Sequence, residues 1–125
     1  MTTTGDAFVN ALAAKDEQGL RAVLTEDVDF RGLTPEKAWQ GTGHDAVLAV
    51  LLGGWFEAHD EIVEVREVDV DSVGDRDRVT YRFGLSCAGE ARVTEQHAVF
   101  ETDDQGRIGW LRMLCSGFRP EHASR

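Results

Sequence analysis

Residues 99–118, VFETDDQGRIGWLRMLCSGF, contain two strand-like runs separated by the short polar segment DDQG. Side chains alternate between the two faces of a strand, so Leu111, Met113 and Cys115 share one face of the second run. A short segment of this composition between two such runs is typical of a hairpin connection. The stretch therefore predicts two antiparallel strands joined as a hairpin.

The residues before this hairpin continue the strand pattern. Residues 78–87, RVTYRFGLSC, place Tyr81, Phe83 and Leu85 on one face, and residues 61–73, EIVEVREVDVDSV, alternate apolar and acidic side chains. The segments GDRD and AGEA are polar, glycine-containing turns. Four consecutive antiparallel strands are expected from about residue 61 onward.

The first half of the chain is mainly helical in pattern. Helical spacing predicts helices over residues 6–14, 16–24 and 43–59, with Asp16 as the N-cap of the second and Gly53-Gly54 weakening the third. A short strand at 28–33 is expected to end at Gly32 and Pro35. The order α-α-β-α-β-β-β-β predicts an α+β domain, with one curved sheet packed on helices.

Length and composition indicate one domain, residues 1–125, with an ordered core over about 6–118 and a polar C-terminal tail. The net charge of −10 disfavours nucleic acid and anionic membranes as partners. No apolar run is long enough to cross a bilayer, and the start of the chain has no pattern of a secretory signal. Cys87 and Cys115 are expected to be reduced thiols in the cytoplasm.

Three segments together resemble the nuclear transport factor 2-like superfamily, which includes the SnoaL-like cyclases and the ketosteroid isomerases. They are FVNALAAKDEQGLRAVLTEDVDF, WQGTGHDAVLAVLLGGW and VFETDDQGRIGWLRMLCSGF, and the resemblance covers about residues 6–118. It implies a cone: a curved, mostly antiparallel sheet wrapped around the long third helix, with two shorter N-terminal helices and an apolar pocket. It also implies homodimers formed through the outer face of the sheet. Isomerases, dehydratases, epoxide hydrolases, cyclases and non-catalytic adaptors share this fold, so the fold does not select a reaction.

The isomerase pattern does not carry over to this chain. Its catalytic base falls at Gly32, its tyrosine donor at Phe8 and its protonated aspartate at Ala98, and none of these residues can perform those roles. We therefore do not expect ketosteroid isomerase activity.

The register of the last three long strands decides which side chains face the pocket. With Tyr81, Phe83 and Leu85 inward, residues Thr94, Gln96, Ala98, Phe100, Leu111, Met113 and Cys115 also face inward. Trp39, in a glycine-flanked loop, is expected at the pocket mouth, and Trp55 deeper on the third helix. The predicted ligand-binding residues are Phe30, Trp39, Trp55, Tyr81, Phe83, Gln96, Phe100, Met113 and Cys115.

Two catalytic candidates follow, Tyr81 and His97. In the favoured register, Tyr81 donates a hydrogen bond to a ligand oxygen. In the opposite register, His97 and Glu95 face inward as an acid–base pair. That register also buries Arg82 and Arg112, and it turns three large apolar side chains outward.

Asp27 and Asp29 flank Val28 at the junction of helix and strand. Asp27 is read as a residue that bonds nearby backbone groups. Asp29 alternates with Phe30 and is therefore expected to point into solvent, although the opposite register would give it a catalytic position.

The remaining outward positions predict a dimer interface that contains His97, Trp110, Arg112 and Leu114. The four histidines are scattered without metal-ligand spacing, and no cofactor motif is present, so neither a metal nor a cofactor is expected.

The predicted function is binding of a hydrophobic, oxygenated small molecule, with isomerisation, cyclisation or dehydration as the reaction types. The alternative is a non-catalytic ligand-binding or scaffold dimer.

Overall fold

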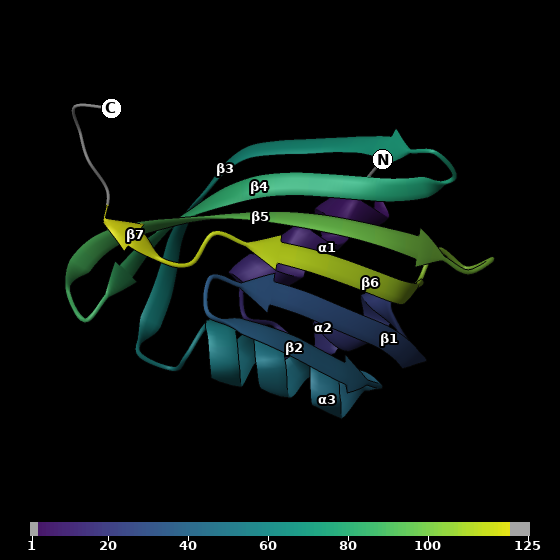
Figure 1. Cartoon of the computed structure of the whole chain (residues 1–125), viewed down its shortest axis with the longest axis horizontal. Helices are drawn as coiled ribbons and strands as arrows, with labels where there is room; N and C mark the ends of the chain where they lie inside the picture. Colours follow the sequence, from purple (N-terminus) through teal and green to yellow (C-terminus); the bar gives the residue numbers. More distant parts are fainter. Residues whose placement is uncertain (1–2, 121–125) are drawn as a thin grey trace.

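Among residues 3–120, which the computed structural model describes, seven strands join in one curved sheet with the helices on one side (Figure 1). The helical segments are α1 (Thr4–Ala13), α2 (Glu17–Val23) and α3 (His44–Ala49), which continues into the π-helix η1 (Val50–Trp55). The strands are β1 (Leu24–Thr34), β2 (Lys37–Thr42), β3 (Asp60–Val73), β4 (Arg76–Cys87), β5 (Glu90–Thr102), β6 (Ile108–Cys115) and β7 (Arg119–Pro120). The α+β class and the curved, mostly antiparallel sheet are confirmed.

The strand order is β2-β1-β6-β5-β4-β3, with the short β7 paired to β5. Only β1 and β6 pair in parallel among these ladders; the other pairs are antiparallel. Helix α1 packs against β3 and β4, whereas α3 packs against β1 and β2. The parallel pair therefore joins the N-terminal half of the chain to its C-terminal hairpin.

Buried and exposed side chains alternate along β4, β5 and β6 in the predicted register. Tyr81, Phe83 and Leu85 on β4 are buried, as are Gln96 and Phe100 on β5. On β6, Leu111, Met113 and Cys115 are buried, while Leu114 between them is 53% exposed. The inner face of the sheet is thus almost free of charged groups.

The N-cap predicted for the second helix is confirmed, whereas the role predicted for Asp27 differs. The Asp16 carboxylate accepts a hydrogen bond from the Gly19 N–H at 3.0 Å and caps α2. Helix α2 ends at Val23, so Asp27 lies within β1 and not at the helix end. Its carboxylate accepts from the Thr25 hydroxyl at 3.0 Å, whereas a bond to the backbone was predicted.

Strand β1 is longer than predicted. It begins at Leu24 and continues through Gly32 to Thr34, because β2 pairs with it on one side and β6 on the other. Trp39 was predicted in a loop, and this was wrong: it lies in β2, opposite Gly32. Arg119 and Pro120 of the predicted polar tail form β7, and residues 121–125 lie outside the described part of the chain.

The third helix ends at Trp55 rather than at His59, and its second half is π-helical. Gly53 and Gly54 lower the helix propensity of this half. A Cβ on Gly54 would lie 2.9 Å from Cζ3 of Trp39, so the glycine permits the close approach of that ring. A Cβ on Gly53 would have no atom within 4 Å. Of the described helices, none is long and apolar enough to cross a membrane.

The two adjacent glycines provide a matched test of this packing. Gly54→Ala is expected to lower the free energy of unfolding by about 1–3 kcal/mol, because the added methyl overpacks the contact with Trp39. Gly53→Ala has open space and is expected to be neutral or to stabilise by up to about 1 kcal/mol. Urea denaturation of both variants measures the difference, and equal effects at the two positions would contradict the described contact.

Candidate ligand-binding site at the end of the sheet

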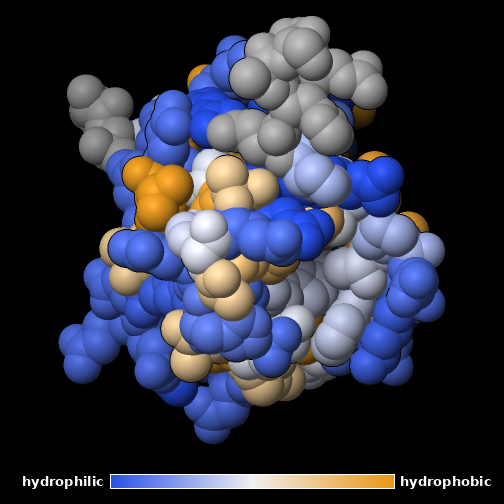
Figure 2. Space-filling view, turned by 90° about the vertical axis from the view of Figure 1, so that its left-hand side faces the viewer, coloured by the Kyte–Doolittle hydropathy of each residue, from blue (hydrophilic) through white to orange (hydrophobic). Residues whose placement is uncertain are grey.

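A cavity of about 410 Å³ opens at the end of the molecule where β4 turns into β5 and where β7 lies. Figure 2 faces this end and shows hydrophobic patches among hydrophilic residues. We call it the end cavity. Its lining residues are Thr34, Trp39, Gly54, Trp55, Glu57, His59, Asp60, Cys87, Arg92, Cys115, Gly117 and Phe118.

Trp39 forms one wall of the end cavity. Its indole N–H donates to the Thr34 hydroxyl at 3.0 Å, across the β1–β2 hairpin. The Lys37 ammonium lies 3.9 Å from the centre of the ring. The hydrogen bond to Thr34 and the packing on Gly54 hold the Trp39 ring in place, so the cavity has a positioned aromatic wall.

Trp55 forms the adjoining wall and is almost fully buried. Its ring meets Trp39 edge-to-face at a centroid distance of 6.4 Å, and it meets Phe30 in the same manner at 6.0 Å. A Cβ on Gly32 would lie 2.8 Å from Cη2 and Cζ2 of Trp55. The indole N–H of Trp55 is buried and has no hydrogen-bond partner among the described residues.

The packing of Trp55 on Gly32 leaves no room for the catalytic base that the isomerase pattern has at this position. The side of Gly32 that a side chain would occupy is filled by the Trp55 ring, so a carboxylate there would have to displace the indole. The other two isomerase positions, Phe8 and Ala98, are fully buried in the core.

Cys115 connects the end cavity to a buried polar chain. The Tyr81 hydroxyl donates to Oε1 of Gln96 at 2.6 Å, and Nε2 of Gln96 donates to the Cys115 sulfur at 3.4 Å. The Gly117 N–H also donates to this sulfur, at 3.4 Å. Burial, and to a lesser extent Cys115, raises the pKa of Tyr81 well above its ordinary value. Tyr81 therefore acts as a hydrogen-bond donor and not as a base near neutral pH.

Asp60 is the main feature of the cavity that the sequence did not reveal. Its side chain is buried, and Oδ2 accepts the Glu57 N–H at 3.1 Å. Nε2 of His59 lies 3.5 Å from Oδ1. Asp60 pairs across the ladder with Cys87, and this pairing is visible only once the register of β3 and β4 is known.

The Cys87 thiol has a perturbed acidity. Burial is the largest cause, and a hydrogen bond with the Asp60 carboxylate adds to it; together they raise the pKa of Cys87 to about 11. Cys87 is thus a neutral thiol near neutral pH and donates to Asp60.

Glu57, His59 and Asp60 bring potential metal-ligand atoms within 4.8 Å of one another. The hydrogen bonds within the turn account for the position of the Asp60 carboxylate, and Glu57 and His59 are exposed. We assign no metal to this cluster.

The predicted ligand-binding residues divide into two groups. Trp39, Trp55 and Cys115 line the end cavity. The others lie in the packed interior behind it: Phe30, Tyr81, Phe83, Gln96, Phe100 and Met113. The contacts of both groups with a ligand stay predictions.

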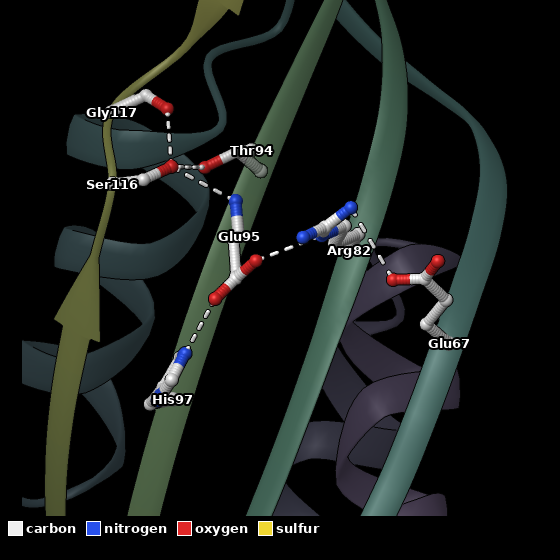
Figure 3. A network of polar contacts seen from close by, with 7 residues as sticks. All are labelled: Glu67, Arg82, Thr94, Glu95, His97, Ser116 and Gly117. Atoms are coloured by element: carbon white, nitrogen blue, oxygen red, sulfur yellow. Dashed lines mark hydrogen bonds and ion pairs between the residues drawn. The ribbon is translucent and has the colours of Figure 1, made fainter. Parts of the chain in front are cut away.

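The second catalytic candidate, His97, lies on the opposite face of the sheet (Figure 3). Its Nε2 is 2.7 Å from Oε2 of Glu95, and Oε1 of Glu95 accepts from Nε of Arg82 at 2.8 Å. The hydrogen bonds from His97 and then Arg82 lower the pKa of Glu95. The pair of Glu95 and His97 is present, but it lies on the outer face of the sheet because Tyr81 and Gln96 occupy the inner positions.

Other outward positions carry charged side chains. Arg112 donates to the backbone oxygen of Asp29 at 3.0 Å, and the Asp29 carboxylate lies 3.4 Å away. Asp29 therefore faces solvent, as its alternation with Phe30 predicted. Trp110 stacks between the guanidinium groups of Arg76 and Arg112.

Comparison with known proteins places this geometry in a family. A search of curated proteins found no match. A provisionally assigned isomerase from Rhodopseudomonas palustris superposes with a TM-score of 0.75 at 18% identity, covering 94% of this chain and 92% of that one. An LEH-like epoxide hydrolase from M. tuberculosis gives a TM-score of 0.67 at 21% identity, with coverage of 90% and 80%.

An NTF2-like protein of unknown function from Burkholderia xenovorans gives a TM-score of 0.66 at 15% identity, with coverage of 98% and 87%. These identities are low, so the likeness concerns the fold. Residues 6–109 match the SnoaL-like domain. The chain therefore belongs to the SnoaL-like domain family, and its fold is like that of the NTF2-like protein.

Proposed function

We propose that this protein binds a hydrophobic, oxygenated small molecule in the end cavity. The observation that carries the proposal is the composition of the cavity, in which the aromatic walls Trp39, Trp55 and Phe118 adjoin a few polar groups. Apolar walls with a small number of placed polar groups are typical of small-molecule sites. The volume of about 410 Å³ is within the range of such sites.

In this proposal the ligand lies against two adjoining aromatic walls, Trp39 and Trp55. Cys115 contacts the ligand at the inner end, and the Tyr81–Gln96 pair fixes the orientation of Cys115 from behind. The apolar side chains of Phe30, Phe83, Phe100 and Met113 support the walls from the core.

A second candidate function is acid–base turnover in the same cavity. Asp60 favours it, because a buried carboxylate with a neighbouring imidazole is a common arrangement for proton transfer. Isomerisation, cyclisation and dehydration each need one or two proton transfers, and Asp60 with His59 would supply them. Tyr81 would act only as a donor.

We further propose that two copies associate through the outer face of the sheet. Leu33 and Leu114 lie opposite each other on β1 and β6 and are 52% and 53% exposed. His97 continues this row on β5, and Arg112 and Trp110 lie on the neighbouring outward positions of β6. An apolar pair with a polar rim is the pattern of a protein interface, and its self-complementarity favours a second copy.

The binding proposal predicts that Trp39→Ala weakens a bound compound. A panel of bicyclic ketones and alcohols, screened by thermal shift and tryptophan fluorescence, should yield at least one ligand. Its affinity should fall by about 10-fold or more in Trp39→Ala, since truncation of an aromatic wall commonly costs over 1 kcal/mol. Trp110→Ala, which removes a tryptophan from the outer face, is the control and should bind normally.

The same incubations, analysed by mass spectrometry and chromatography, detect turnover. If Asp60 transfers protons, Asp60→Asn should lose turnover while it retains binding. A ligand that binds without any product in the wild-type protein would favour the non-catalytic alternative. A full panel without a ligand would overturn the binding proposal.

The acidity of Cys87 predicts slow alkylation in the folded protein. With a pKa of about 11, the thiolate fraction at pH 8 is on the order of 100-fold smaller than in an unfolded chain with an ordinary thiol. Because burial disfavours the anion, the rate with iodoacetamide should rise mainly as the pH approaches 11. Peptide mass mapping separates Cys87 from Cys115, and a rate that levels off near pH 9 would contradict the assignment.

The dimer proposal predicts that Leu114→Arg produces a monomer. The introduced arginine would lie against Leu33 and Leu114 of the second copy, where its charge would be costly to desolvate. Light scattering coupled to size exclusion should show a dimer for the wild type and for the control Val73→Arg, an exposed valine at the far end of β3. A wild-type monomer at all concentrations tested would refute the interface.

A further inference from the structure

We infer that Lys15 is a positioning residue for the end cavity, because its ammonium group holds the turn from which Glu57 and Asp60 enter that cavity. The inference rests on the proposed function, since the place of the Asp60 carboxylate matters only if the cavity binds or converts a ligand. Lys15 itself does not line the cavity, so it acts through the turn and not by contact with the ligand.

The first observation is a pair of hydrogen bonds that joins two turns distant in the sequence. Nζ of Lys15, between α1 and α2, donates to the backbone oxygen of Glu57 at 2.6 Å and also to that of Asp60. The two acceptors lie at the two ends of the turn that connects η1 to β3. Hydrogen bonds from a charged donor are stronger than neutral ones, so one cation fixes both ends of this turn.

The second observation is the strained backbone of Lys15. Its φ is +51°, in the left-handed region, and it directly follows the C-cap of α1. Its N–H donates to the Leu12 oxygen at 3.0 Å, and the Asp16 N–H donates to the Ala11 oxygen at 2.9 Å, which is the Schellman pattern. Glycine is the usual residue at this position because it has no Cβ to strain. A lysine here costs stability that its two side-chain hydrogen bonds offset, which indicates that the ammonium has a role beyond ending the helix.

The third observation is that the same turn determines where the Asp60 carboxylate lies. The Glu57 N–H donates to Oδ2 of Asp60 at 3.1 Å, and the Asp60 N–H donates to the Glu57 oxygen at 3.0 Å. That Glu57 oxygen is also an acceptor for Lys15. The Asp60 side chain is buried and bonds the Cys87 thiol. Loss of the ammonium is therefore expected to loosen the turn and to move the carboxylate away from Cys87.

The acidity of Cys87 reports the place of the Asp60 carboxylate without any ligand. Burial is the largest cause of the Cys87 pKa of about 11, and the hydrogen bond with Asp60 is the next. Of the other charged groups that act on this thiol, Glu90 also raises its pKa and Arg92 lowers it. If the carboxylate moves away, the pKa of Cys87 falls and more thiolate is present at any pH below it.

The test is the rate of Cys87 alkylation by iodoacetamide from pH 7 to 11 in Lys15→Gly. This variant loses the ammonium but relieves the left-handed backbone, so it separates positioning from folding. We expect the rate at pH 9 to rise about 3- to 10-fold, because each unit of pKa changes the thiolate fraction about 10-fold. Peptide mass mapping measures Cys87 and Cys115 in the same sample.

Two further variants serve as controls. Lys15→Arg keeps a charged donor of similar length and should retain the wild-type pH dependence of Cys87 alkylation. Asp16→Ala removes the N-cap of α2 at the adjacent position and lowers stability, but it leaves the lysine in place. It should therefore also show the wild-type pH dependence.

The outcomes separate the inference from the proposed function. A rise at Cys87 alone in Lys15→Gly, with wild-type behaviour of both controls, supports the positioning role. An unchanged Cys87 profile in Lys15→Gly overturns the inference and leaves the binding function in place. A rise that is equal at Cys115, or that Lys15→Arg or Asp16→Ala shares, reports general opening and also overturns it. No ligand enters this measurement, so a ligand panel without a binder overturns the binding proposal alone.

Discussion

The pairing of β4 with β5, which places Tyr81 opposite Gln96 and Arg82 opposite Glu95, determines which chemistry each face of the sheet carries. A shift of β5 by one residue would exchange its inner and outer side chains, and Glu95 and His97 of Figure 3 would then lie in the core. The cost of burying Arg82 and Glu95 is far larger than the cost of burying the hydrogen-bonded pair Tyr81 and Gln96. This constraint keeps the interior neutral and directs the charged groups outward.

A neutral interior also explains where reactive groups are found. The buried pair Tyr81 and Gln96 can donate and orient, but it contains no base at neutral pH. Three ionisable groups of the end cavity, Glu57, His59 and Asp60, come from the turn after η1 and the start of β3, and Arg92 of β5 adds a cation. Binding and proton transfer would thus occur at the end of the sheet rather than deep inside it.

The sequence was sufficient for the fold and for the register of β4, β5 and β6, because period-two alternation of large apolar residues is a strong signal when one face is buried. It was not sufficient for the position of Trp39, because a six-residue edge strand that follows Pro35 and contains Gly41 has the composition of a loop. The change to a π-helix was also not predictable, since glycines indicate a weak helix but not its hydrogen-bond pattern. Asp60 was missed because its burial and its pairing with Cys87 depend on the register of β3 and β4, which no local pattern records.

The central claim is that the end cavity holds an oxygenated apolar molecule against its aromatic walls, Trp39 and Trp55. A crystal structure of the protein grown with a bicyclic ketone, 1-tetralone, tests this most directly. The account predicts the bicyclic ring in the end cavity, in contact with both indoles. An end cavity without the ketone, or a ketone bound only elsewhere on the protein, would contradict it.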